Sequence, residues 1–129
     1  MYLRFITQFI NEIGQKETGL FNALAFIRNN PETQFEDVAK LDELYNWFKE
    51  NLDAPEWFTR PQYRMHEYHS LSWFKDTAKE HIIKMQEIIE VLEKYDIIVE
   101  RVTSKKPGSI FFEDKFQISA VSPNKKRVI

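Results

Sequence analysis

Residues 2–10 alternate between apolar and polar side chains, which is the period of a half-buried strand. The positions that would share one face are Leu3, Phe5, Thr7 and Phe9. Several apolar residues of the same segment also fit a helical period, but its β-branched and aromatic content favours a strand. We therefore expect a strand at residues 2–10, followed by a break between Gly14 and Gly19.

Two helices are predicted in the next third of the chain. Residues 20–27 have apolar side chains at helical spacing, and Pro31 ends this segment because the residue before a proline is driven out of the helical region. The second helix is expected to begin at Thr33, which forms with Glu36 the Thr-x-x-Glu pattern of a capping box. Its apolar positions step by three and four as far as Leu52.

The third predicted helix has the longest apolar seam. It begins with Ser70 or Ser72 as the N-cap and reaches Tyr95, a length of about 25 residues. The seam positions alternate steps of four and three: Phe74, Ala78, His81, Met85, Ile88, Leu92 and Tyr95. Charged residues fill the opposite face, so the helix is expected to pack along one side only.

The last third of the chain returns to a period of two and predicts three strands. They are expected at residues 97–102, 109–112 and 116–121, with turns at 106–108 and 113–115. In the last strand Gln117 and Ser119 alternate with apolar residues, which predicts one solvated face.

Helices and strands are segregated along the chain, and such an arrangement predicts an α+β fold. The expected order is β-α-α-α-β-β-β, with three helices packed on one face of a small antiparallel sheet. We expect a single domain at residues 1–121 and a basic tail at residues 122–129.

The composition excludes several kinds of site. The 129 residues include no cysteine, which removes disulfide frameworks, thiolate catalysis and cysteine-ligated zinc. The three glycines are scattered, so no glycine-rich phosphate loop is expected. No apolar run is long enough to span a membrane and no cleavage site follows the first residues, so we expect a cytoplasmic protein without a membrane partner.

The net charge of −2 combines two opposed regions, because residues 1–100 carry −7 and residues 101–129 carry +5. A basic sheet bearing Phe111, Phe112 and Phe116 could bind single-stranded nucleic acid by stacking, which is one alternative function. Nucleic acid is nevertheless disfavoured as the partner, because the acidic region repels phosphates and the chain has no RNA-binding motif.

No catalytic residue is predicted, and no metal ion or other cofactor is expected. Ser72 and Lys75 match a Ser-x-x-Lys spacing, but the companion motifs are missing and a serine at a predicted helix start is expected to be an N-cap. His66, His69 and His81 could form a three-histidine metal site. The first two lie in a predicted loop, however, and the spacing does not decide whether Glu67 or Glu113 would be the carboxylate that orients a ring.

His81 is the most informative polar residue, because it lies on the apolar seam of the third predicted helix. A histidine there is expected to be a core residue that bonds a backbone carbonyl or a side chain of the sheet. The alternative is a ligand-facing histidine. In that case the protein would be a small enzyme or ligand-binding domain with a cleft around His81, in which Glu113 or Lys75 takes part.

The segment from residue 53 to 69 has no sustained period and is rich in aromatic residues. Long ordered loops of this kind are often functional, although packing of the rings in a core is the simpler interpretation. Trp, Tyr and Arg are enriched where proteins bind each other. The candidate binding residues are therefore Trp57, Arg60, Arg64, Tyr68, Trp73 and His81.

Several short stretches, taken together and in order, resemble a family of small uncharacterised bacterial proteins. They are Leu3-Arg4-Phe5, Gly19-Leu20-Phe21, Trp47-Phe48, Asn51-Leu52, Pro55, Ser72-Trp73-Phe74-Lys75, Ala78, His81-Ile82, Pro107-Gly108, Glu113-Asp114 and Gln117. The resemblance covers most of the chain and implies a bacterial, cytoplasmic setting. It implies no activity, ligand or catalytic residue.

The sequence as a whole favours a non-enzymatic binding or protein-interaction module over an enzyme, with a protein as the partner. The last predicted strand or the seam of the third helix could also pair two copies of the chain into a homodimer.

Overall fold

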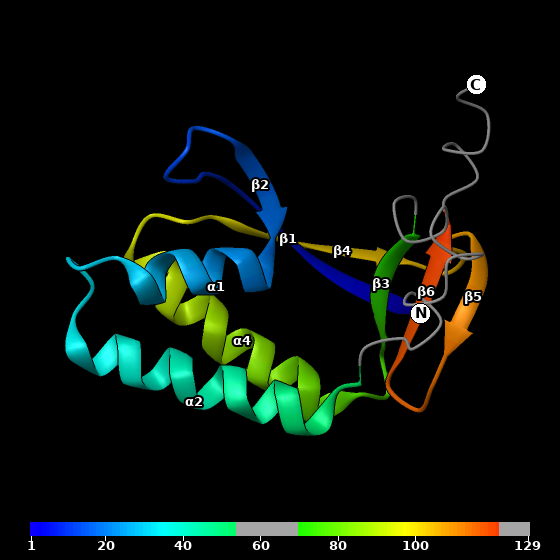
Figure 1. Ribbon diagram of the computed structural model, residues 1–129. Helices are drawn as coiled ribbons and strands as arrows, with labels where there is room; N and C mark the ends of the chain where they lie inside the picture. The colour runs from blue at the N-terminus through cyan, green and yellow to red at the C-terminus, as the bar shows by residue number, and fades with distance from the viewer. Residues whose placement is uncertain (54–69, 122–129) are drawn as a thin grey trace. The chain divides into compact units, whose positions relative to one another are not determined.

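The computed structural model describes residues 1–53 and 70–121 and has the expected α+β fold (Figure 1). Its described elements are three helices and a six-stranded antiparallel sheet. In chain order they are β1 (Tyr2–Ile10), β2 (Lys16–Gly19), α1 (Leu20–Asn29), α2 (Phe35–Asn51), β3 (Ser70–Lys75), α4 (Lys79–Lys94), β4 (Val99–Ser104), β5 (Ser109–Glu113) and β6 (Gln117–Val121).

The chain divides into two compact units. The sheet unit consists of Met1–Arg4, Leu52–Lys79 and Thr103–Ile129, and the helical unit consists of Phe5–Asn51 and Glu80–Val102. The strand order is β2-β1-β3-β6-β5, with β4 also paired to β1. The single domain at residues 1–121 stays a prediction, and the basic tail lies outside the described residues.

Strand β1 confirms the first predicted element and its buried face. Leu3, Phe5, Thr7 and Phe9 are all buried, whereas the residues between them are partly or fully exposed. The predicted break after it is in fact a tight turn followed by strand β2, which pairs antiparallel with β1. The sequence of β2, Lys-Glu-Thr-Gly, has no apolar residue, so only its backbone pairing identifies it as a strand.

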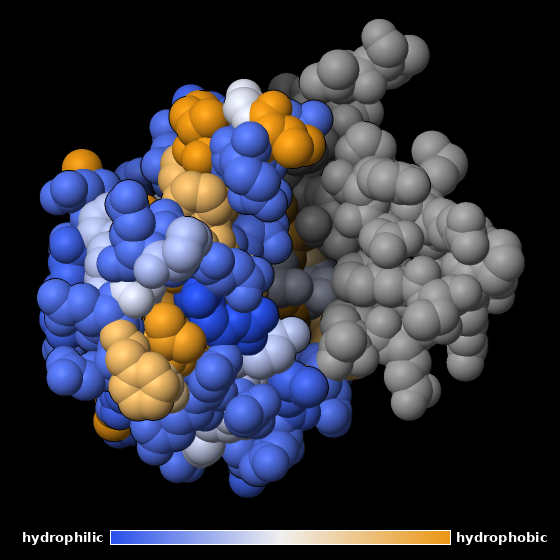
Figure 2. Space-filling model, turned by 60° about the vertical axis from the view of Figure 1, so that its left-hand side comes forward, coloured by the Kyte–Doolittle hydropathy of each residue, from blue (hydrophilic) through white to orange (hydrophobic). Residues whose placement is uncertain are grey.

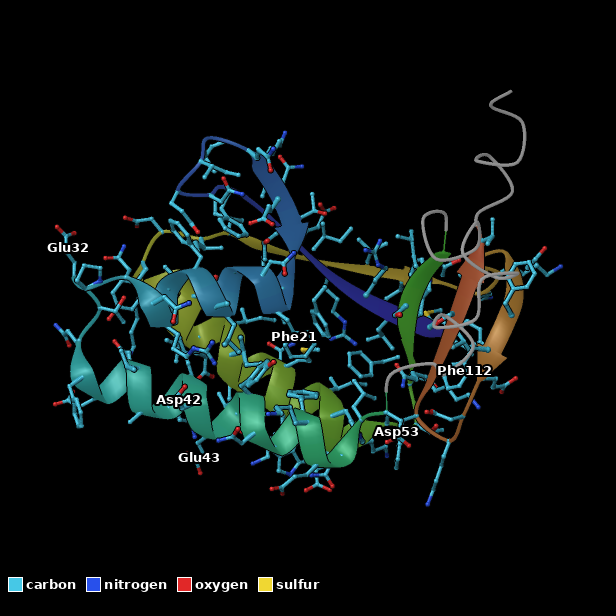
Figure 3. The ribbon with its side chains drawn as sticks, viewed as in Figure 1. Phe21, Glu32, Asp42, Glu43, Asp53 and Phe112 are labelled. Carbon is cyan, nitrogen blue, oxygen red and sulfur yellow. The ribbon has the colours of Figure 1, made fainter. Side chains whose placement is uncertain are left out.

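The core of the helical unit lies between α1, α2 and α4, whose apolar faces the sequence spacing predicts although two of their starts differ. Helix α1 packs against α2, and Lys40 of α2 forms an ion pair with Glu87 of α4, which sets these helices side by side (Figure 1). Phe21 at the start of α1 reaches the ring of Phe48 on α2, with 5.2 Å between the ring centroids (Figure 3). The largest fully buried apolar side chains of these helices are Leu24, Leu41, Leu44, Ile88 and Leu92.

The predicted capping box at the start of the second helix is wrong. Helix α2 begins at Phe35, and the amides of Asp37 and Val38 donate to the carbonyl of Gln34. The Thr33 hydroxyl instead donates to the carbonyl of Ile27 at the end of α1. The hydroxyl therefore caps the C-terminal end of α1, where the last carbonyls lack donors within the helix.

The start of the third predicted helix is also wrong, because residues 70–75 form strand β3. This strand pairs antiparallel with β6 over five residues, and Leu3 of β1 pairs with Phe74 on its other side. A turn at Asp76 and Thr77 separates β3 from α4, so the helix has 16 residues. The order of the described elements is therefore β-β-α-α-β-α-β-β-β, with two more strands in the described part of the chain than predicted.

The last three strands agree with the sequence in position but not in exposure. Asp96 adopts a left-handed conformation with φ of 64° after α4, so β4 begins at Val99 and not at residue 97. The predicted solvated face of the last strand is wrong, because all five residues of β6 are buried. The backbone edges of β6 are paired with β3 and β5, and the side chains on both of its faces are covered as well.

None of the helices in the described ranges is long and apolar enough to cross a membrane.

Candidate functional site

The structure describes two of the six predicted binding residues. Trp57, Arg60, Arg64 and Tyr68 lie outside the described residues. Trp73 lies on β3 in the sheet unit, and His81 lies on α4 in the helical unit. Both side chains are buried, so neither forms an exposed aromatic patch.

His81 has the surroundings of a core histidine. Its Nε2 lies 2.7 Å from the backbone carbonyl oxygen of Asn51, the last residue of α2, so this ring nitrogen carries the proton and donates it. The imidazole packs edge-on against Trp47, with 4.9 Å between the ring centroids. Its hydrogen bond caps the end of α2, where helix carbonyls lack intrahelical donors.

The two residues proposed as partners of His81 in an enzymatic cleft bind each other. Lys75 Nζ and Glu113 Oε2 are 2.6 Å apart on β3 and β5 of the sheet unit. This ion pair neutralises the charges of both groups. That the chain has no catalytic residue stays a prediction.

The aromatic residues of the alternative nucleic-acid surface lie on β5 and in the turn before β6. Phe111 is exposed and Phe112 partly exposed on β5 (Figure 3), and Phe116 has the ammonium of Lys115 5.7 Å from its ring centroid. Within residues 1–53 and 70–121, no group of three His, Asp or Glu side chains could hold a metal ion.

The cavity of the helical unit lies between the β1–β2 hairpin and helix α1, and sequence reasoning missed it. Its volume is about 620 Å³. The residues that give it a polar lining are Glu12, Glu17, Asn22, Asn29 and Asn30, with Phe26 as the aromatic wall.

The hairpin brings the two carboxylates to this cavity. Gly14 has a φ of 81°, which only glycine adopts without strain, and the side chain of Asn11 accepts hydrogen bonds from the amides of Ile13 and Gln15. These interactions fix the turn between Asn11 and Gln15, so that Glu12 lies within it and Glu17 follows it in β2. Glu17 pairs with Phe9 of β1.

Helix α1 supplies the rest of the cavity from the side that does not face the core. Asn22, Ala25, Phe26 and Asn29 follow each other at helical spacing and line the cavity. The Phe26 ring packs against Phe9, with 5.1 Å between the ring centroids. Asn30 caps the end of the helix, and its side chain accepts a hydrogen bond from the amide of Glu32. This spacing was visible in the sequence, but the position of Glu12 and Glu17 was not.

The charged residues that line the cavity, Glu12 and Glu17, are both negative. Among the described residues, neither Glu12 nor Glu17 forms an ion pair, and the lining that the structure describes includes no lysine or arginine. The nearest cation on the helix, Arg28, is paired with Asp42 of α2 at 3.5 Å. Two uncompensated carboxylates beside three amide side chains form a site that attracts cations.

A second polar cluster of the helical unit connects the start of α2 to the end of α4. The Tyr95 hydroxyl and the Lys94 ammonium both donate to the buried carboxylate of Asp37. These hydrogen bonds lower the pKa of Asp37, and the bond to Asp37 raises the pKa of Tyr95. All members are paired with each other, which indicates a structural role.

No protein-family model, curated protein or solved structure matches this chain. The resemblance to a family of small uncharacterised bacterial proteins therefore stays a prediction.

Proposed function

We propose that the protein is a non-enzymatic interaction module whose helical unit binds a positively charged segment of a partner protein. The observation that carries this proposal is the cavity of the helical unit, where Glu12 and Glu17 lie on the lining and no lysine or arginine of the described residues compensates their charges. Lysine or arginine side chains of a partner would neutralise the carboxylates of Glu12 and Glu17.

The charge of the whole helical unit supports a basic partner. Its sequence contains fourteen acidic and seven basic residues, a net charge of −7, whereas the complete chain carries only −2. A field of this sign accelerates the encounter with a basic partner and repels the phosphates of nucleic acids.

The lining of the cavity also fits the shape of a lysine or arginine side chain. Phe26 offers an apolar surface for the aliphatic stem and a ring face for the cation, while Asn22 and Asn29 can bond the backbone of the partner. A volume of about 620 Å³ suits a short peptide segment. On the face drawn in Figure 2, hydrophilic residues predominate and apolar residues form separate small patches, which favours polar recognition.

The chemistry of the remaining candidates supports a binding role over a catalytic one. The imidazole of His81 donates to a backbone carbonyl, and Lys75 is paired with Glu113. The cytoplasm remains the proposed compartment, and a cysteine-free chain is compatible with it.

The test is a binding titration with two designed probes. A fluorescein-labelled hexapeptide of alternating arginine and leucine is titrated with the protein by fluorescence anisotropy, beside a peptide in which glutamate replaces arginine. We expect saturable binding of the basic peptide only. In the double variant Glu12→Gln, Glu17→Gln the affinity should fall at least about fivefold, since an ion pair to the partly buried Glu17 contributes about 1 kcal/mol and one to the exposed Glu12 contributes less.

A matched control separates the cavity from the general field of the unit. Glu50 and Glu90 are exposed and form no ion pair among the described residues, and Glu50→Gln with Glu90→Gln removes the same charge. This control should keep the affinity within about twofold. Equal losses in the two double variants, or no binding of the basic peptide, would contradict the proposal.

A further inference from the structure

Arg4 of the sheet unit differs from every other partly buried cation in the described part of the chain. Those others each have a carboxylate within 4 Å: they are Arg28, Lys40, Lys75 and Lys84. Arg4 forms no ion pair among the described residues. Burial lowers the pKa of its guanidinium, because the charge has lost part of its water without gaining an anion.

Trp73, which lies next to Arg4, carries another hydrogen-bond donor without an acceptor among the described residues. The side chain is only 8% exposed, and its indole Nε1 has no hydrogen-bond partner within residues 1–53 and 70–121. A buried N–H group without an acceptor costs about 1–3 kcal/mol, so such groups are rare in folded proteins.

The pairing of β1 with β3 brings these two donors to one place. Tyr2 pairs with Lys75 and Leu3 with Phe74, and the same register continued by one residue sets Arg4 beside Trp73. The guanidinium carbon lies 5.9 Å from the centroid of the indole ring. Lys75, which follows on the same face of β3, is already neutralised by Glu113.

We propose that Arg4 and Trp73 form a binding site for an oxyanion, with a carboxylate or phosphate oxygen accepting from both the guanidinium and the indole N–H. The shared requirement is a negatively charged acceptor. A water molecule could accept from the indole but would leave the desolvated guanidinium without a counter-charge. The anion enters the site past the side chain of Arg4, which is partly exposed.

This site is independent of the proposed function. It lies in the sheet unit, whose sequence has eleven basic and six acidic residues, a net charge of +5. The field of that unit attracts anions, in contrast to the field of the helical unit.

The test follows the indole N–H signals of the ¹⁵N-labelled protein by NMR during separate titrations with inorganic phosphate, acetate and, for ionic strength, chloride. The signal of Trp73 is assigned by its loss in Trp73→Phe. We expect it to shift saturably with phosphate or acetate and not with chloride, and the anion that saturates at the lower concentration identifies the preferred source.

Two arginine variants keep the test decisive. Arg4→Met should abolish the saturable shift, whereas Arg4→Lys, which keeps the charge but loses the planar fork, should weaken binding several-fold. Arg28→Met is the matched control, since Arg28 also stacks on an aromatic ring but is paired with a carboxylate. A Trp73 signal that does not respond, responds equally to chloride, or responds unchanged in both Arg4 variants would overturn the proposal.

Discussion

Among the described residues, the candidate sites of the helical unit and the sheet unit carry charges of opposite sign that form no ion pair. In the helical unit these are the carboxylates of Glu12 and Glu17, which lie on the lining of a cavity. In the sheet unit it is the guanidinium of Arg4, a partly buried cation beside a buried indole N–H. The near-neutral total of −2 therefore hides two regions with net charges of −7 and +5, and each region is suited to a different class of ligand.

The largest expected effect comes from removing one core side chain in each unit. Leu41 and Ile118 are both 0% exposed, and Leu41→Ala or Ile118→Ala should lower the free energy of unfolding by about 2–5 kcal/mol. Because the units are separately compact, Leu41→Ala should raise amide hydrogen exchange in α2 and α4 more than in β5 and β6, and Ile118→Ala should do the reverse. A uniform rise in both variants would contradict the division into two units.

The second effect concerns His81. His81→Leu removes the donor to the Asn51 carbonyl and should lower the free energy of unfolding by about 1–2 kcal/mol, measured by urea denaturation. Binding of the basic peptide should not change, because His81 is not part of the cavity lining described above. Unchanged stability together with lost binding would instead favour the ligand-facing histidine of the alternative interpretation.

The third effect is a dependence of stability on pH. Hydrogen bonds from Tyr95 and Lys94 lower the pKa of Asp37 below its ordinary value of 3.8. A carboxylate with a lowered pKa stabilises the folded state above its unfolded pKa, and this contribution is lost as the pH falls through the folded pKa. Acid denaturation below about pH 4 should therefore be less steep in Asp37→Asn than in the parent protein. Parallel curves for the two proteins would show that Asp37 contributes nothing.

The smallest effect is expected at the cavity itself. Glu12→Gln with Glu17→Gln breaks no ion pair among the described residues, so the free energy of unfolding should change by no more than about 0.5 kcal/mol. Thermal unfolding checks this. A clear loss of stability would mean that the carboxylates serve the fold, and it would remove the contrast with the paired carboxylates of α2 and α4.

Local periodicity was sufficient for the elements whose residues contact neighbours close in sequence. It located α1 and α2, because each has one apolar face at helical spacing and forms its own backbone hydrogen bonds. It located β1, because apolar and polar residues alternate along that strand. It failed at residues 70–75, where Phe74 continues the helical spacing of Ala78 and His81. This segment is a strand because it pairs with β6, and this pairing joins residues more than forty positions apart in the sequence.

The candidate sites were predictable only in part for the same reason. Asn22, Phe26 and Asn29 share a helix face that the sequence already shows, but a hairpin that contains an all-polar strand places Glu12 and Glu17 beside them. Likewise Trp73 was identified as a candidate, whereas its neighbour Arg4 follows only from the pairing of β1 with β3. Long-range strand pairing is the information that local patterns lack.

The most direct test of the two opposed sites is one NMR experiment on the ¹⁵N-labelled protein, with the arginine–leucine hexapeptide and inorganic phosphate added to separate samples. The peptide should shift the backbone amides of residues 12–30 and leave the indole N–H of Trp73 in place. Phosphate should shift the Trp73 indole and leave residues 12–30 unchanged. If both ligands shift the same set of signals, or if the peptide shifts none of the amides of residues 12–30, the assignment of a cation-binding cavity to the helical unit is wrong.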